Sequence, residues 1–130
     1  KIDNDVIVGI QPTSPIRLNN DLDNAILKFK KEKLDSLFTA QVIYDYFVWT
    51  KNGNKLIPNY NYKKRQRRQD IKEKYLENGS FFLFKSKKFL KTRCRFFGKI
   101  GLFTMRKTSS FQIDDQEDIK IMRGLEKYLT

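Results

Sequence analysis

The sequence predicts an α/β fold, and three consecutive segments carry this prediction. Residues Val6–Ile10 form a continuous β-branched run, which is typical of a central strand covered on both faces of a sheet. Residues Asp21–Lys33 place apolar side chains at helical spacing and lysines on the opposite side, so an amphipathic helix is expected there. Residues Ser36–Ile43 predict a second strand, and a strand, a helix and a strand in this order form the unit from which parallel sheets are built. The apolar face of the helix consists of Leu22, Ala25, Ile26 and Phe29.

The middle of the chain predicts a hairpin followed by a loop. An Asn-Gly step at Asn52 lies between the apolar segments Tyr44–Trp49 and Lys55–Ile57, which is a strong short-range signal for a β-hairpin. The polar and aromatic stretch Asn59–Arg68 is expected to be a loop or arm. One or two helical turns are expected at Ile71–Glu77.

The last third of the chain predicts two further strands and two helices. The aromatic-rich segment Phe81–Lys85 is typical of a buried strand, and Ser86 is placed to cap a short helix that runs to Arg93. Residues Lys99–Met105 predict another strand, and Asp115–Leu129 a terminal amphipathic helix with acidic residues in its first turn. The apolar face of that helix is expected to contain Ile121, Met122, Leu125, Tyr128 and Leu129.

The composition limits the chemistry that the chain can perform. Its 130 residues suffice for one domain at most, and 27 basic against 15 acidic residues give a net charge of +12, five of which come from Lys63–Arg68. This balance favours anionic partners such as nucleic acid, nucleotides or acidic sugars. The chain has no histidine, which excludes His-based triads, His-ligated zinc and imidazole bases within it. A single cysteine, Cys94, excludes an intrachain disulfide and favours a reducing compartment, the cytoplasm.

The ends and the hydropathy of the chain add two expectations. No apolar run is long enough to span a membrane, and no signal peptide is visible. The chain opens with Lys1 and enters the apolar run at Val6 almost at once. We therefore expect it to be the back part of a longer protein.

A polar loop follows the first predicted strand. The segment Gln11–Pro15 comes directly after Val6–Ile10, and ligands of open α/β sheets bind beyond the carboxyl ends of strands. Its two prolines restrict the path of the loop, while Gln11, Thr13 and Ser14 offer hydrogen-bond donors and acceptors. An ordinary strand-to-helix turn explains the same residues, so both interpretations stay open from position alone.

Carboxylates cluster between the last predicted strand and the last helix. Mg²⁺ is usually held by one or two carboxylates together with substrate phosphates, so this cluster is a candidate metal site. The favoured interpretation of Asp115, Glu117 and Asp118 is a helix N-terminus, where they act as caps and as partners of the helix dipole. Only Asp114, which lies ahead of the helix, is a candidate metal ligand by position.

The basic arm contains a third polar group, Arg67, Arg68 and Gln69. The planar guanidinium of arginine pairs bidentately with carboxylate or phosphate groups. Further along, Asn78 and Gly79 predict a tight turn before the strand at Phe81, and they need no other role to explain them.

Taken in order, these polar groups resemble the motifs of the acylneuraminate cytidylyltransferase family, which includes the CMP-sialic acid synthetases and their relatives acting on legionaminic acid, pseudaminic acid and Kdo. The resemblance rests on Gln-Pro-Thr-Ser-Pro-Ile-Arg, Lys-Arg-Gln-Arg-Arg-Gln-Asp, Glu-Asn-Gly-Ser-Phe-Phe-Leu-Phe and Ile-Asp followed by Asp118. These motifs occupy Gln11–Arg17, Lys64–Asp70, Glu77–Phe84 and Ile113–Asp118.

The resemblance implies a Rossmann-like α/β nucleotidyltransferase fold of three layers, the nucleotide-diphospho-sugar transferase type. Residues 1–130 would be the C-terminal part of a single cytidylyltransferase domain that lacks its N-terminal half, with a dimerisation hairpin and basic arm at 44–70. Such an enzyme joins CTP to an acidic nine-carbon sugar, releases pyrophosphate with Mg²⁺ (or Mn²⁺), and works as a homodimer. Because the family's phosphate-binding loop and a further metal-binding Asp belong to the missing half, this chain alone is expected to be inactive.

The resemblance also implies roles for individual residues. Gln11 would lie at the sugar, Arg68 and Gln69 would reach its carboxylate and hydroxyls, and Asp114 would bind the metal. The hairpin and arm around Phe47–Tyr62 would form the dimer contact. Thr13, Ser14 and Asn78 complete the expected substrate-binding set.

The chain departs from the family pattern at two positions. Gln112 stands where an acidic residue is frequent, and Gln116 stands where a proline is frequent.

Two other functions stay open at this point. A nucleic-acid-binding module built on Lys63–Arg68 would bind RNA or DNA with a steep salt dependence, although no RNP-like motif or zinc spacing accompanies it and nucleic acid is the less expected partner. The other alternative is a non-catalytic dimerisation fragment of the same fold.

Overall fold

The computed structural model describes residues 6–126, and the chain divides into two compact units. The first unit comprises Lys1–Gln41 and Glu77–Thr130, and the second comprises Val42–Leu76. The hairpin and arm expected at 44–70 fall inside the second unit. None of the helices within residues 6–126 is long and apolar enough to cross a membrane.

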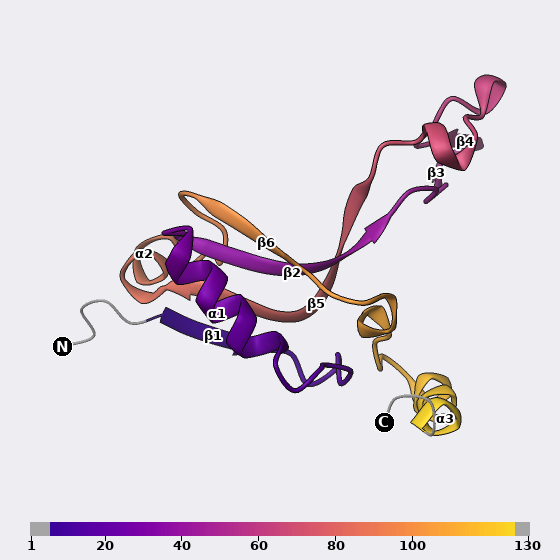
Figure 1. Ribbon diagram of the computed structural model, residues 1–130. Coiled ribbons are helices and arrows are strands. Elements are labelled where there is room, and N and C mark those ends of the chain that lie inside the picture. The colour runs from indigo at the N-terminus through magenta and orange to yellow at the C-terminus, as the bar shows by residue number, and fades with distance from the viewer. Residues whose placement is uncertain (1–5, 127–130) are drawn as a thin grey trace. The chain divides into compact units, whose positions relative to one another are not determined.

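The first unit is built on a mixed sheet of four strands (Figure 1). These are β1 (Val6–Ile10), β2 (Ser36–Ile43), β5 (Lys74–Lys85) and β6 (Ile100–Thr104), in the spatial order β1-β5-β2-β6. Strands β1 and β5 pair antiparallel, whereas β2 and β6 pair parallel. The α/β class is therefore confirmed, and the bounds of β2 agree with the segment expected from the sequence.

The prediction that Val6–Ile10 is the central strand is wrong for the sheet that the described residues form. Strand β1 lies on the outside of this sheet, pairs with β5 alone, and its residues are half-buried or exposed. The strand covered on both faces is β5, in which every residue from Asn78 to Phe84 is buried. Because β5 lies between β1 and β2, these two strands are not neighbours, and the parallel unit expected from them is interrupted.

Helix α1 (Asp21–Lys31) covers one face of the sheet with the apolar side predicted for it. Ala25 and Phe29 are buried against Leu37, Phe81 and other core residues. Leu22 and Ile26, on the same side of the helix, pack against this core. Burying one phenylalanine or leucine side chain stabilises the fold by about 1.5–3 kcal/mol relative to leaving it exposed.

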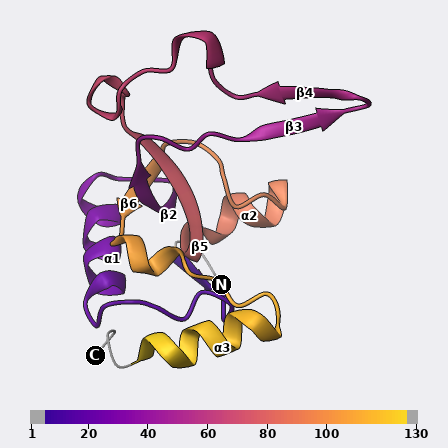
Figure 2. The ribbon, with the colours of Figure 1, turned by 90° about the vertical axis from the view of Figure 1, so that its right-hand side faces the viewer.

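The opposite face of the sheet is covered by α2 (Ser86–Thr92) and the segment after it, as Figure 2 shows. The rings of Phe84 and Phe89 lie 4.8 Å apart, and those of Phe82 and Phe96 lie 5.9 Å apart. Ser86 does not cap α2 as predicted, because the N-cap position falls on Lys85 and Ser86 is the first helical residue.

Helix α3 (Gln116–Leu125) begins with the acidic cap that the sequence predicts. Asp115 is the N-cap and forms a capping box with Asp118, which satisfies backbone N–H groups at the start of the helix. The expected apolar face is only partly correct: Met122 and Leu125 are half-buried, but Ile121 is 46% exposed. Tyr128 and Leu129 lie outside the described residues.

The second unit contains the predicted hairpin. Strands β3 (Trp49–Asn52) and β4 (Lys55–Pro58) pair antiparallel around a two-residue loop that begins at Gly53, whose φ is +59°. The helix expected at Ile71–Glu77 is absent from this part of the structure, because β5 already begins at Lys74. Pairing within the sheet overrides the local preference of a short segment.

Candidate functional site

The loop Gln11–Pro15 is attached to the middle of β5. The backbone N–H of Gln11 donates to the carbonyl of Ser80 (3.2 Å), and the backbone N–H of Ser14 donates to the carbonyl of Gln11 (3.3 Å). The Ser14 side chain is fully buried and its Oγ donates to the carbonyl of Asn78 at 3.2 Å. Three hydrogen bonds therefore hold the backbone of this loop in one conformation beside β5.

Gly79 allows the Gln11 side chain to lie directly against β5. Its φ of +64° is in the left-handed region that favours glycine. A β-carbon at this position would also collide with Oε1 of Gln11 and would lie 3.4 Å from Nε2 of Gln112. The two carboxamides therefore meet over Gly79, and both the backbone angle and the available space require glycine here.

Asn78 connects the site to the sheet beneath it. Its Oδ1 accepts from Oγ1 of Thr39 (2.6 Å) and from the backbone N–H of Ser80 (3.2 Å), while its Nδ2 donates to Oγ of Ser109 (2.9 Å). The residue is 1% exposed. The structure thus places Asn78 below the site surface, with its carboxamide occupied by protein partners, where it positions neighbouring residues.

Gln112 and the segment that follows it lie beside the same loop. Nε2 of Gln112 donates to the carbonyl of Asn78 (3.0 Å), which is also the acceptor for Ser14. The backbone N–H of Ile113 donates to the carbonyl of Thr13 (2.8 Å), whose side chain is exposed. These bonds bring Asp114 to the loop that carries Gln11, although about one hundred residues separate them in sequence.

Arg17 is a member of the site that the candidate residues did not include. Its Nη1 donates to the carbonyl of Ser14 (2.7 Å) and lies 3.4 Å from Oγ of Ser80. The side chain is half-buried, so it places a positive charge next to the loop. The available signal was its position at the end of the Gln-Pro-Thr-Ser-Pro-Ile-Arg motif.

Within the acidic cluster, the carboxylates of Asp115 and Asp118 cap α3, whereas that of Asp114, ahead of the helix, takes no part in the cap. The Asp115 side chain accepts from the N–H groups of Glu117 and Asp118 (2.8 and 3.0 Å), and the Asp118 side chain accepts from those of Asp114 and Asp115 (2.9 and 3.2 Å). The Asp114 residue is exposed, and its carboxylate accepts no hydrogen bond within residues 6–126. No group of three or more His, Cys, Asp or Glu residues in that range could hold a metal ion. The donor set therefore fits Mg²⁺ only where phosphate oxygens of a substrate supply further ligands.

Arg68 and Gln69 lie in the second unit, where together with Tyr44 they line a hollow of about 320 Å³. The Arg68 Nε is 3.9 Å from Oδ1 of Asp45, and its guanidinium carbon is 5.9 Å from the centroid of the Tyr44 ring. The Arg68 side chain is 73% exposed, which leaves most of its donors available to a ligand.

The predicted site residues thus fall into two groups, one in each unit. Gln11, Thr13, Ser14 and Asn78 lie together in the first unit with the segment that carries Asp114. Arg68 and Gln69 lie together in the second.

Comparison with known proteins yields two relatives, whereas no protein-family model matches the chain. An N-acylneuraminate cytidylyltransferase from Streptococcus agalactiae is 27% identical, in an alignment that covers 89% of this chain and 29% of the relative. A post-translational flagellin modification protein B from Campylobacter coli is 28% identical, and the alignment covers 95% of this chain and 53% of the relative. The chain therefore spans only about a third to a half of the length of these curated relatives.

The first relative bears the name of the family that the four sequence motifs resemble, and the alignment covers 89% of this chain. Cytidylyltransferases are nucleotidyltransferase enzymes. Over most of its length this chain is thus similar to an N-acylneuraminate cytidylyltransferase, as its motifs predicted.

Proposed function

We propose that this chain forms part of a cytidylyltransferase that transfers a CMP group from CTP to an acidic nine-carbon sugar and releases pyrophosphate. One observation in the structure carries the proposal. Two of the four motif segments, separated by a long stretch of sequence, meet at Gly79 in the first unit, and the N–H of Ile113, which begins a third motif segment, donates to the carbonyl of Thr13. The similarity to a curated cytidylyltransferase supports the same assignment.

In this proposal the polar groups around Gly79 bind the hydroxyls of the sugar. The carboxamide of Gln11 has both a donor and an acceptor, and it lies against Gly79, where the absence of a side chain makes room for it. Arg17 would neutralise negative charge on the bound substrate. Its Nη1 donates to the Ser14 carbonyl, which fixes the guanidinium in place, and its other nitrogens stay available to the substrate. Ser14 and Asn78 would hold this arrangement in place from below.

Arg68 is proposed to bind the carboxylate of the sugar. Its exposed guanidinium can form the bidentate pair that a carboxylate accepts, and Gln69 beside it can bind a hydroxyl. The weak contact with Asp45, at 3.9 Å, would orient the guanidinium and leave most of its N–H donors available to the sugar.

Asp114 is proposed to hold Mg²⁺ together with phosphate oxygens of CTP. The bound ion would neutralise charge that develops on the phosphates. Residues beyond this chain would bind the remainder of CTP, in keeping with the share of the relatives that the chain spans. We further propose a homodimer in which the hairpin Trp49–Pro58 takes part, since Trp49, Leu56 and Ile57 are 45–64% exposed there.

A turnover assay on the longest natural form of the protein tests the proposal. Pyrophosphate release is measured with CTP and Mg²⁺ against N-acetylneuraminic, legionaminic and pseudaminic acids and Kdo. We expect release with at least one of these sugars and none when the sugar is omitted. Absence of release with every acidic sugar would favour the non-catalytic interpretation of the fold.

A matched pair of variants tests the role of Arg68. Arg68→Ala is expected to raise the KM for the sugar by at least about tenfold and to leave the KM for CTP nearly unchanged, because a charge-assisted pair contributes about 1.5–3 kcal/mol. Arg67→Ala removes the same charge from the neighbouring position and is expected to change both values little. Equal effects on both substrates would show that Arg68 does not bind the sugar carboxylate.

A further inference from the structure

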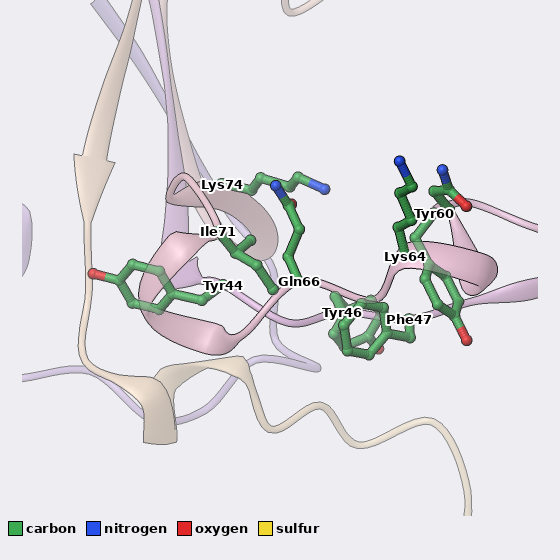
Figure 3. Close-up of a pocket in the computed structure, with 9 residues that line it drawn as sticks. Tyr44, Tyr46, Phe47, Tyr60, Lys64, Gln66, Ile71 and Lys74 are labelled. Carbon is green, nitrogen blue, oxygen red and sulfur yellow. The ribbon is translucent and has the colours of Figure 1, made fainter.

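The second unit contains a cavity of about 500 Å³ that none of the proposed sugar-binding residues lines. Its lining combines aromatic rings, two lysines, two carboxamides and an isoleucine. This volume lies within the range of about 300–1,000 Å³ that is usual for small-molecule sites. Figure 3 shows the polar ends of Lys64, Gln66 and Lys74 on one side, and the rings of Tyr46 and Phe47 below them.

Four aromatic rings provide the apolar part of the cavity: Tyr44, Tyr46, Phe47 and Tyr60. The centroids of Phe47 and Tyr60 are 4.4 Å apart, so these two rings support each other. The guanidinium carbon of Arg65 lies 4.3 Å from the Phe47 centroid and occupies part of the surface of that ring. The ring surfaces that these contacts leave uncovered offer a stacking surface for a flat, unsaturated ring.

The charge of the cavity is entirely positive. Lys64 and Lys74 line it, and no acidic side chain does. The unit Val42–Leu76 as a whole has nine basic and three acidic residues, so its net charge of +6 is half of the +12 of the chain. A lysine ammonium is a mobile point charge that binds phosphate well, and the surrounding excess of positive charge raises the local concentration of anions.

We propose that this cavity binds a nucleoside monophosphate. The base stacks on the aromatic rings, and the phosphate lies between the ammonium groups of Lys64 and Lys74. The carboxamide of Gln66 and the Nδ2 of Asn61 bond to the edge of the base, while the Oδ1 of Asn61 accepts from the N–H of Lys63. A ligand with many hydroxyls suits the site less well, because the lining has much ring surface and no carboxylate to accept hydrogen bonds from them. This inference does not depend on the proposed transferase activity.

Trp49 supplies a signal with which to test the proposal. It is the only tryptophan of the chain, and its ring centroid is 6.0 Å from that of Tyr60, which lines the cavity. Titration of the full chain with CMP or AMP at physiological ionic strength is expected to change the Trp49 fluorescence saturably. Cytidine, ribose 5-phosphate and inorganic phosphate are each expected to bind at least about tenfold more weakly, because each lacks the ring or the charge.

Two double variants distinguish specific binding of CMP in the cavity from nonspecific attraction of CMP to a basic surface. Lys64→Gln with Lys74→Gln is expected to weaken CMP binding at least about tenfold. Lys51→Gln with Lys55→Gln removes the same charge from the hairpin of the same unit, outside the cavity, and is expected to change binding less than about threefold.

Three results would overturn the proposal. One is the absence of a saturable change with CMP and AMP through the millimolar range, with circular dichroism showing a folded chain. Another is equal weakening by the two double variants, which would mean that only net charge matters. The third is binding of single-stranded oligonucleotides without binding of either mononucleotide, which would identify a nucleic-acid strand as the ligand instead.

Discussion

Asp35 joins three segments of the first unit, and its removal has an effect that can be worked out from the structure. Its Oδ2 accepts from the backbone N–H of Lys99 (2.9 Å), and its Oδ1 lies 2.9 Å from the Nζ of Lys85 and 3.7 Å from that of Lys88. The hydrogen bond from Lys99, and then the bond from Lys85, lower the pKa of Asp35 from 3.8 to about 2.

The size of the effect follows from this pKa. The drop from 3.8 to about 2 corresponds to about 2.4 kcal/mol, because one pKa unit equals about 1.36 kcal/mol. The Asp35 side chain is 20% exposed, but those of Lys85 and Lys88 are 47% and 52% exposed, so solvent screens part of the attraction. We therefore expect Asp35→Asn to lower the free energy of unfolding by about 1–2 kcal/mol at pH 7.

The pH dependence gives this prediction its sharpest test. Because folding lowers the pKa of Asp35, its contribution is complete above the unfolded pKa and is lost as the pH falls from about 4 through about 2. The difference between the natural chain and Asp35→Asn should therefore be largest near neutral pH and fall to a small fraction of that value near pH 2. Urea unfolding followed by circular dichroism at several pH values measures it.

Asp114→Asn is the matched control for this measurement. It also replaces a carboxylate by a carboxamide, but at an exposed position whose carboxylate accepts no hydrogen bond within residues 6–126. Its free energy of unfolding is expected to stay within about 0.5 kcal/mol of the natural value. The reasoning would be refuted if Asp35→Asn lowered the free energy of unfolding at pH 7 no more than this control does. It would also be refuted if Asp35→Asn lowered that free energy by the same amount at pH 7 and at pH 2.

Four further predictions concern the candidate site and the helix beside it. Gly79→Ala should destabilise the chain by about 1–3 kcal/mol and raise the sugar KM of the active protein, because a β-carbon at this left-handed position displaces Gln11; an unchanged KM would contradict this role. Asn78→Ala should cost about 2–4 kcal/mol in a urea unfolding experiment, since it removes three hydrogen bonds of a buried side chain, and a cost below about 1 kcal/mol would mean that the network is not stabilising. Asp114→Asn should abolish Mg²⁺-dependent pyrophosphate release, and near-normal rates would remove Asp114 from the metal site. Asp115→Ala should cost about 0.5–2 kcal/mol of stability by removing the N-cap of α3, whereas an unchanged melting temperature would show that the cap does not stabilise the fold.

Much of the secondary structure was predictable because the signals for it are local. The apolar spacing in Asp21–Lys33, the Asn-Gly step at Asn52 and the acidic cap at Asp115 each act within a few residues. The structure contains the expected element at each place, with the first helix ending at Lys31. The prediction of a helix at Ile71–Glu77 is wrong because the structure of this segment is not set locally. Its seven residues are too few to stabilise a helix alone, and they lie where the long strand β5 begins.

The candidate site was predictable in its residues but not in their arrangement. The motifs identified Gln11 and Asp114, and the structure places the segment that carries Asp114 beside the loop that carries Gln11. Nothing local shows that Asn78 is buried or that Arg17 donates to the Ser14 carbonyl, because these facts depend on which segments pack together.

The sequence by itself determined most of the local elements of this protein, its positive charge, its lack of histidine and the four motifs that resemble those of a nucleotidyltransferase family. Only the tertiary structure decided that β5 lies between β1 and β2 and that β5 is the buried strand. It also decided the contact of Gln11 with Gly79 and the bond from Ser14 to Asn78 across 64 residues. Local elements arise from neighbouring residues, whereas the order of strands and the close approach of two side chains depend on the burial of surfaces that are far apart in the chain.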